Sequence, residues 1–202
     1  MESIAITAKS RSEFGKKANK ALRKEGLVPC VMYGGSAVKH FSVTPKSVKT
    51  AIYTAEFKIS KVDVDGTSHD CIIKDIQFHP VTDEILHIDF IELIDGKSVN
   101  AEIPLHPVGT AAGVIVGGKL MQLMRRVKVK STPNSLVDAL EVDVTSLELG
   151  QSVRVKDITV PEGVTVMNDG SIPVMMVEIP RALRSAENAE DAEDVAVDEP
   201  AE

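Results

Sequence analysis

The sequence predicts a mostly β protein: an N-terminal small β-barrel with two to three helices, followed by an all-β C-terminal domain and a disordered acidic tail. Three observations lead to this prediction. The first part of the chain alternates short extended runs with helical ones, the second part carries extended runs separated by turn residues, and the chain ends in an Ala/Glu/Asp segment. A chain of 202 residues has room for one large domain or two small ones.

Two segments of the first domain have helical signatures. The run from Phe14 to Glu25 ends at Gly26, a residue that readily adopts the left-handed conformation found after helices. A second helix begins at Thr44-Pro45, with threonine as the N-cap and proline at the first helical position, and continues to about Tyr53. By helical spacing, the first helix has an apolar face and an adjoining basic face, made respectively by Ala18, Ala21 and Leu22 and by Lys16, Lys20, Arg23 and Lys24.

The remaining runs of the first domain are predicted strands, at 4–8, 28–33, 40–43, 57–64, 67–78 and 84–93. The turn pair Asp65-Gly66 makes 57–78 a hairpin. In the last strand, Leu86, Ile88 and Phe90 form an apolar face that we expect in the core, whereas the other face carries His87 and Asp89. About six short strands and two helices in some 90 residues suggest a small, partly closed barrel.

We place the domain boundaries at 1–93, 98–180 and 181–202. The turn pair Asp95-Gly96 separates the first two segments. The second domain reads as strands at 99–108, 125–130, 140–144, 152–160, 165–170 and 172–179, with one helical turn near 145–149. The last segment has no aromatic residue, and we expect it to be disordered or to form a fraying helix.

Charge is segregated along the chain. The formal net charge is −7, yet residues 1–60 carry 11 basic and 4 acidic residues, and the tail carries 2 basic and 8 acidic ones. A basic segment on a nearly neutral body indicates a polyanion-binding face, although a solvated helix face would account for the charge alone equally well. Neither an apolar signal segment nor a membrane-spanning run is present, so we expect the chain to remain in the cytoplasm. Cys30 and Cys71 read as reduced core thiols.

Two motifs that suggest other functions have simpler explanations. Residues 113–119 match the spacing of a phosphate-binding loop, but Leu120 stands where such loops carry the magnesium-binding Ser or Thr, so we expect a Gly-rich hairpin. His87 and Asp89 resemble two members of a catalytic triad, but no serine lies in a nucleophile elbow. The histidines and cysteines lack zinc-ligand spacing. We therefore predict no enzyme, no cofactor and no metal.

The sequence contains the side chains that RNA recognition requires. Arg11 and Arg23 have guanidinium groups that bridge phosphates or stack on bases. Tyr33 offers a ring for stacking, although a half-buried strand residue is an equally good interpretation. His87 and Asp89 provide a donor to phosphate or ribose and an acceptor from guanine N–H or a 2′-OH. Because its charge opposes affinity, a carboxylate in such a site makes sense only as a specificity device.

Several segments resemble a known family. They are RSEFGKKANKALRKEG (11–26), VPCVMYGG (28–35), DIQFHP (75–80) with LHIDF (86–90), IPLHPVGTAAGVIVGGKL (103–120) and LEVDVTSLELGQSV (140–153). Together they are similar to the bacterial large-subunit ribosomal protein L twenty-five, in its long general stress protein CTC form. The resemblance implies a non-enzymatic 5S rRNA-binding protein of the central protuberance, with the large subunit and its proteins as partners and no membrane or small-molecule substrate.

The resemblance also implies where the RNA contacts lie. The matching positions are Arg11, Arg23, Tyr33, His87 and Asp89, and Lys16, Lys17 and Gln77 match neighbouring positions. Short family members stop near Phe90, so the second domain is not needed for RNA binding by this analogy. The alternative function is a stress-related protein-docking module that acts through the second domain, with incidental RNA binding. An enzyme that uses His87 and Asp89 is a third interpretation.

Overall fold

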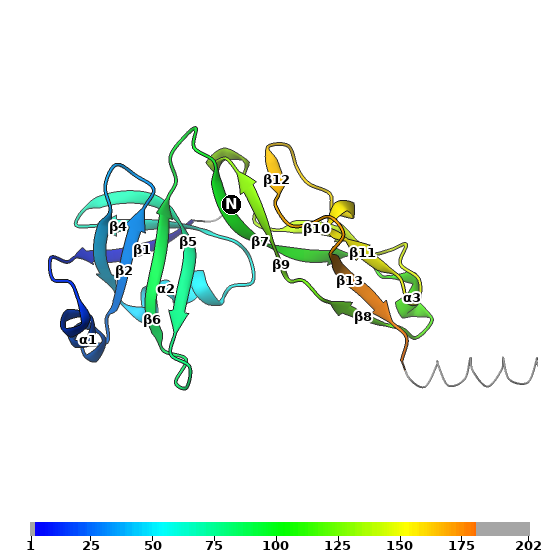
Figure 1. Ribbon diagram of the computed structural model, residues 1–202, viewed down its shortest axis with the longest axis horizontal. Helices are drawn as coiled ribbons and strands as arrows, with labels where there is room; N and C mark the ends of the chain where they lie inside the picture. The colour runs from blue at the N-terminus through cyan, green and yellow to red at the C-terminus, as the bar shows by residue number, and fades with distance from the viewer. Residues whose placement is uncertain (1–2, 181–202) are drawn as a thin grey trace, which may run out of the picture. The chain divides into compact units, whose positions relative to one another are not determined.

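A computed structural model describes residues 3–180, to which all structural statements below refer. Six strands form a closed barrel in the order β1-β3-β2-β6-β5-β4 (Figure 1). Their bounds are β1 Ser3–Ser10, β2 Val28–Tyr33, β3 Lys39–Val43, β4 Ile59–Val64, β5 Thr67–Phe78 and β6 Ile85–Glu92. The predicted fold class is confirmed, and the strands coincide closely with the predicted ones because alternation and turn pairs delimit them.

The barrel interior is built from aliphatic and sulfur side chains around one aromatic pair. The rings of Phe41 and Phe90 lie 5.7 Å apart, and both side chains are fully buried. Ile88 is equally buried, as the alternation in β6 predicts, whereas Leu86 is only half-buried. Cys30 and Cys71 are buried free thiols, as expected. Since aromatic residues make up only 3% of the chain, sulfur and branched aliphatic side chains fill most of this core.

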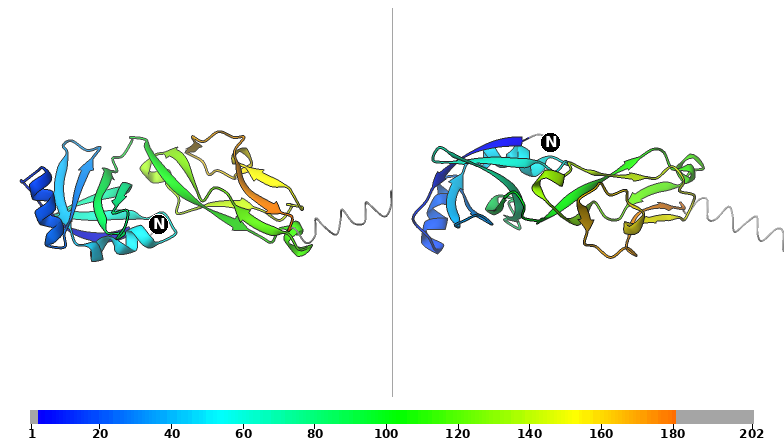
Figure 2. Two further views of the ribbon diagram at one scale, coloured as in Figure 1. Left: turned by 60° about the horizontal axis from the view of Figure 1, so that its bottom comes forward. Right: turned by 90° about the horizontal axis from the view of Figure 1, so that it is seen from above.

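Helix α1 (Lys16–Lys24) is shorter than predicted and lies beside β2 at one end of the barrel (Figure 2). It begins after Gly15, whose φ of 97° is outside the range of a right-handed helix. Phe14 is therefore in the preceding loop. The expected apolar face is partly wrong, because Ala21 is exposed and none of the helix residues is fully buried. The helix is thus a surface element attached by a few side chains.

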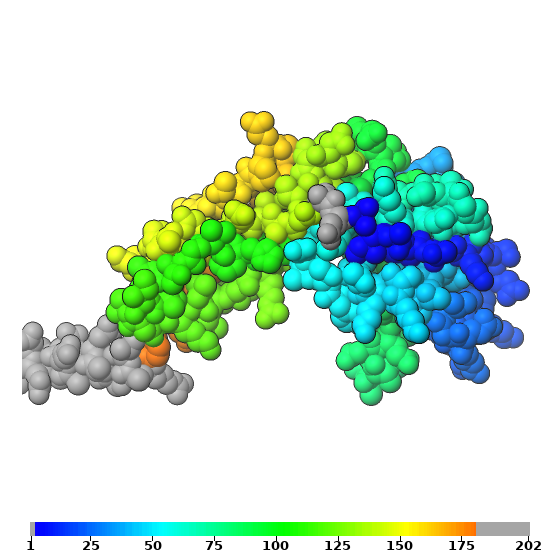
Figure 3. Space-filling view, turned by 180° about the vertical axis from the view of Figure 1, so that it is seen from behind, coloured from blue at the N-terminus to red at the C-terminus, as the bar shows by residue number. Residues whose placement is uncertain are grey.

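Helix α2 (Pro45–Tyr53) is predicted correctly, with Pro45 in the first turn. Its Val48 is fully buried in the barrel core and Ile52 packs against it, so α2 is fixed on β1. Thr44 has the extended conformation of an N-cap, but its hydroxyl makes no capping bond to the helix backbone. In the space-filling view, the loop between β5 and β6 projects beside the surface of α2 (Figure 3).

The rest of the described chain forms two further sheets. One has the order β10-β7-β9-β12 and the other β11-β13-β8. Their bounds are β7 Val99–Val108, β8 Lys119–Gln122, β9 Arg126–Ser131, β10 Leu140–Asp143, β11 Ser152–Arg154, β12 Val164–Val166 and β13 Pro173–Glu178. Short helical turns are α3 Ala112–Ile115, η1 Pro133–Ser135 and η2 Val155–Asp157.

Three predictions for these sheets are wrong in detail, and one of them is the strand expected at 165–170, which spans only Val164–Val166. The helical turn expected at 145–149 lies instead at α3, inside the glycine-rich run predicted to be a hairpin. The amides of Ala112 and Gly113 donate to the carbonyls of Thr145 and Leu147, so the 145–149 segment bonds to α3 rather than to itself. The strand expected at 152–160 ends at Arg154, whose backbone N–H donates to Asp157 and opens η2.

Contacts between Cα atoms divide the chain into two compact units. Among the described residues, one unit comprises 3–104, 128–139 and 160–167, and the other comprises 105–127, 140–159 and 168–180. The boundaries at 93 and 98 stay predictions, although the whole barrel lies within the first unit. The predicted acidic tail, 181–202, falls outside the described residues. Within 3–180, no helix is long and apolar enough to cross a membrane.

Candidate nucleic-acid interface

Strand pairing places three of the expected site residues on one outer face of the barrel. β2 and β6 run parallel with Val31 opposite Asp89, and β5 runs antiparallel to β6 with Gln77 opposite His87. Because Ile88 and Phe90 point into the core, His87 and Asp89 point outward. Asp75 is also opposite Asp89, after a register shift in β5.

His87 and Asp89 form a hydrogen-bonded pair along β6. The imidazole Nδ1 and the carboxylate Oδ1 are 2.7 Å apart, and the two side chains are 20% and 30% exposed. With its Nδ1–H donating to the carboxylate, the ring keeps a fixed orientation and leaves Nε2 for a ligand. Asp89 retains a second oxygen that can accept a hydrogen bond.

Tyr33 ends β2 on the same outer face, opposite Ile91. Partial burial raises the pKa of its hydroxyl, and the carboxylates of Asp89 and Asp75 raise it further. The phenol is therefore neutral and remains able to donate a hydrogen bond. Its proximity to Asp89 places the aromatic ring and the His87–Asp89 pair on one surface.

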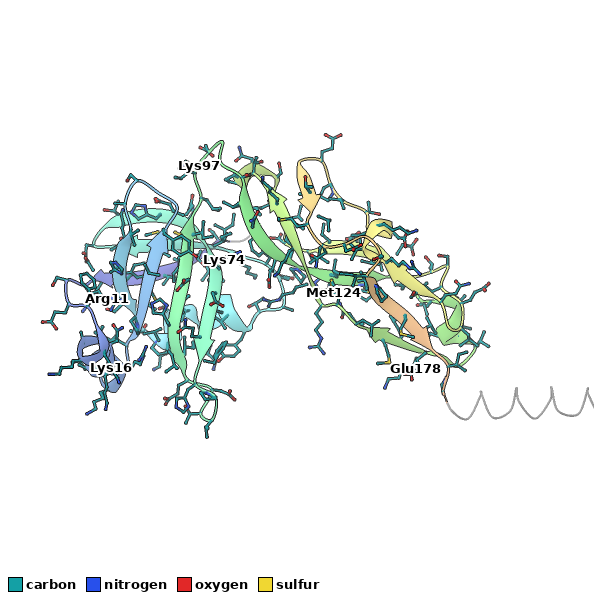
Figure 4. All side chains as sticks on the ribbon, in the orientation of Figure 1. Arg11, Lys16, Lys74, Lys97, Met124 and Glu178 are labelled. Carbon is teal, nitrogen blue, oxygen red and sulfur yellow. The ribbon has the colours of Figure 1, made fainter. Side chains whose placement is uncertain are left out.

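Arg11 is held by a small polar and aromatic cluster after β1. Its Nη1 donates to Asn19 Oδ1 at 2.5 Å, and its guanidinium carbon lies 5.8 Å from the centre of the Phe14 ring. Phe14 is in turn 4.7 Å from His40 between ring centres. The Arg11 Nε is buried without a hydrogen-bond partner among the described residues. Figure 4 shows Arg11 and Lys16 at the same end of the barrel.

The two arginines influence each other. Burial lowers the pKa of Arg11 and the positive charge of Arg23 lowers it further, while the Cys30 thiol acts in the opposite direction. Arg23 Nε donates to the carbonyl oxygen of Leu86 at 3.1 Å, which ties α1 to the residue before His87. The Arg23 guanidinium therefore contacts β6 directly, and that of Arg11 lies close enough to Arg23 to feel its charge. Lys16 and Lys17 are exposed on the first turn of α1.

The cluster around Arg11 was missed by the sequence analysis. Asn19 is half-buried on the side of α1 that also carries Ala18 and Leu22. An amide on the inward side of a basic helix was the available signal, because such a group needs a hydrogen-bond partner. Phe14 and His40 carried no comparable signal, since their contact depends on the path of the loop before α1.

A second group of titratable side chains lies at inward positions near the end of the barrel. His69 Nδ1 is 2.7 Å from Glu92 Oε1, and His69 Nε2 is 2.7 Å from Lys39 Nζ. Each of the three residues lies two positions from a buried residue on its strand, and alternate side chains share a face. The three side chains therefore lie on the inner face of the barrel, beyond the apolar core. Within the described part of the chain, no group of three or more acidic, His or Cys side chains is arranged to hold a metal ion.

Comparisons with known proteins agree on one family. The model of the Ribosomal L25p family matches residues 6–90, and the model of the Ribosomal protein TL5, C-terminal domain, matches 98–181. A Porphyromonas gingivalis protein named large ribosomal subunit protein bL25 is 42% identical over 188 residues, covering 92% of this chain and 97% of the relative. The protein of that name from Cytophaga hutchinsonii is 40% identical over 189 residues, covering 94% and 98%.

Proposed function

The chain belongs to the Ribosomal L25p family and is a structural constituent of the large ribosomal subunit rather than an enzyme, and we propose that its barrel binds 5S rRNA in the central protuberance. The protein is accordingly located at the cytoplasmic ribosome. The proposed contact residues are Arg11, Lys16, Lys17, Arg23, Tyr33, Gln77, His87 and Asp89.

One observation carries this proposal: Arg23 ties helix α1 to β6 at Leu86, the residue directly before the outward-facing His87–Asp89 pair. The cations of α1 and of Arg11 neutralise phosphates and fix the register along the RNA backbone. Arg11, held by Asn19, presents its guanidinium in a set direction and so favours phosphate contact through its remaining Nη–H groups.

The carboxylate gives the face its selectivity. Asp89 repels phosphates, so it contributes only where an RNA donor, such as guanine N–H or a 2′-OH, meets it directly. His87 Nε2 accepts a hydrogen bond from a ribose 2′-OH, and the Tyr33 ring adds a surface on which a base or sugar packs. Such a combination favours a folded RNA site over an unstructured polyanion.

Binding of the full chain to 5S rRNA across a salt series, with tRNA as the control RNA, tests the proposal. We expect a clear preference for 5S rRNA, and a log–log salt slope of about −0.7 to −0.9 per phosphate contact. Arg23→Ala and Asp89→Ala should abolish the preference while the circular dichroism spectrum stays unchanged. Equal affinity for both RNAs would refute the proposal and favour a protein-docking role of 98–180.

The fragment 1–93 tests whether the barrel alone accounts for 5S rRNA binding. The barrel closes between β1 and β4, and its core cluster contains residues from 4 to 90 only. We therefore expect the fragment to fold cooperatively and to bind 5S rRNA as tightly as the full chain. A folded fragment with much weaker binding would assign part of the RNA contact to the second domain.

A further inference from the structure

A groove of about 540 Å³ opens on the barrel beside the proposed interface. The end of α1, the outer side of α2 and the loop before β6 form its walls, and the half-buried Leu27 and Leu86 contribute to its lining. Arg23 belongs both to this groove and to the proposed interface. None of the other residues that line the groove is among the site residues predicted from the sequence.

One wall of the groove is a stripe of three side chains along α2. Lys46, Lys49 and Tyr53 are spaced at i, i+3 and i+7, so they lie on one side of the helix. All three are exposed, and the Tyr53 side chain is 62% accessible. The opposite side of α2 carries Val48, which anchors the helix in the core. The stripe is thus a fixed row of two cations and a phenol ring.

The facing wall is the loop between β5 and β6, and its backbone is well ordered by His79. The amides of Val81 and Thr82 donate to His79 Nδ1 at 3.3 and 3.2 Å. The His79 amide donates to the Glu84 carbonyl at 2.8 Å, and the Asp83 amide donates to the His79 carbonyl at 3.0 Å. These bonds hold Asp83 and Glu84 at the edge of the groove before any ligand binds.

We propose that this groove binds one nucleotide of the rRNA, with the base against Tyr53 and a phosphate at Lys46 and Lys49; the inference rests on the proposed function. A base stacks on any exposed aromatic ring, and the two lysines supply the charge that a phosphate requires. Asp83 and Glu84 accept hydrogen bonds from a base amino group or a ribose 2′-OH. Arg23, shared by both surfaces, connects this nucleotide to the main contact.

The mixture of groups argues for a nucleotide over simpler ligands. A free phosphate would meet two carboxylates across the groove and gain little from the ring. A purely apolar ligand would have to desolvate Arg23 and both lysines, which is unfavourable. A nucleotide has a flat ring, hydrogen-bond donors and an anion in one unit, which matches the three kinds of lining group.

Equilibrium binding of the full chain to 5S rRNA tests the groove directly. We expect Tyr53→Ala to weaken binding roughly 5- to 100-fold, the range for loss of one stacked base, and Tyr53→Phe to restore most of it. The double variant K46Q/K49Q should reduce the salt slope by about 0.7 to 0.9, the contribution of one phosphate contact. The matched control K119Q/K156Q removes two exposed lysines outside the barrel and should leave binding unchanged.

A cleavage reagent tethered at Thr50→Cys gives an independent measurement. Thr50 is exposed on α2 next to Lys49 of the groove, and both native thiols are buried, so labelling is selective. We expect strand cleavage at one short segment of bound 5S rRNA. If the wild-type chain binds 5S rRNA and Arg11→Ala weakens it, but the groove variants match the control and cleavage is absent, the groove proposal alone is overturned. If the wild-type chain shows no preference for 5S rRNA, the proposed function itself fails.

Discussion

His87 and Asp89 are joined along one strand, Nδ1 to Oδ1 at 2.7 Å, on a face where Asp75 is also opposite Asp89. Two carboxylates side by side would repel both each other and RNA. The imidazole donates a hydrogen bond to one carboxylate and fixes that carboxylate in orientation. The pair therefore acts as an oriented acceptor, and its charge is the property to test.

Asp89→Asn keeps the size of the side chain and removes its charge. We expect at least tenfold weaker 5S rRNA binding, because a charge-assisted hydrogen bond contributes roughly 1.5–3 kcal/mol. Binding to tRNA should stay the same or become stronger, since a repulsive charge is gone. Asp95→Asn, at an exposed turn, is the control. A parallel loss of affinity for both RNAs would contradict a selective role for Asp89.

Asn19→Ala removes the acceptor that orients Arg11 and leaves the net charge unchanged. We expect roughly three- to tenfold weaker 5S rRNA binding, about 0.7–1.4 kcal/mol, with an unchanged salt slope because the number of cations is the same. The effect should vanish in an Arg11→Ala background, which a double-mutant cycle measures. Additive effects of the two substitutions would show that Asn19 acts independently of Arg11.

The buried thiols predict a loss of stability at alkaline pH. Burial raises the pKa of Cys30 to about 12, against the charge of Arg11, and burial together with Glu92 raises the pKa of Cys71 to about 12. An unfolded thiol ionises near pH 8.5, so the folded state holds its protons more tightly. The stabilisation is complete below about pH 8.5 and is lost as the pH rises towards about 12, by roughly 1.4 kcal/mol per pH unit for each thiol.

Urea unfolding at about pH 8 and about pH 10.5 measures this loss. The variant C30A/C71A is the comparison, because lysines and tyrosines titrate in the same range in both proteins. We expect the free energy of unfolding to fall less between the two pH values in the variant than in the wild type, whatever the variant's stability at pH 8. An equal fall in the free energy of unfolding in both proteins would mean that the thiols do not cause the loss of stability at alkaline pH.

Gly118→Ala should destabilise the second unit for steric reasons. A Cβ at this position would lie 2.5 Å from Val177 Cγ1 and 2.6 Å from Leu149 Cδ2. Overpacking of this kind costs about 1–3 kcal/mol, measurable by urea unfolding. Gly170→Ala is the control, because its nearest neighbour would be 3.4 Å away. An unchanged free energy of unfolding in the Gly118→Ala protein would show that the glycine is not required for packing.

The barrel and most of its strands could be predicted from local sequence signals. Alternation along 84–93 identified the core residues Ile88 and Phe90, and the Asp65-Gly66 pair identified the hairpin. The start of α1 and the helical turn α3 were not predicted. The start of α1 is set by the positive φ of Gly15, and α3 depends on backbone bonds from 112–113 to the distant segment 145–147.

The charge distribution and motifs of the sequence by themselves determined the family, the fold class and the residue types of the candidate interface. Tertiary structure alone decided which of those residues meet: the parallel register of β2 on β6, the bond from Arg23 to Leu86, and the contact of Arg11 with Asn19. It also brought α2 and the 79–84 loop together as a groove. The physical reason is that periodicity along a chain sets which face a side chain occupies, whereas its neighbours across a sheet are set by strand order and register, which come from packing of the whole core.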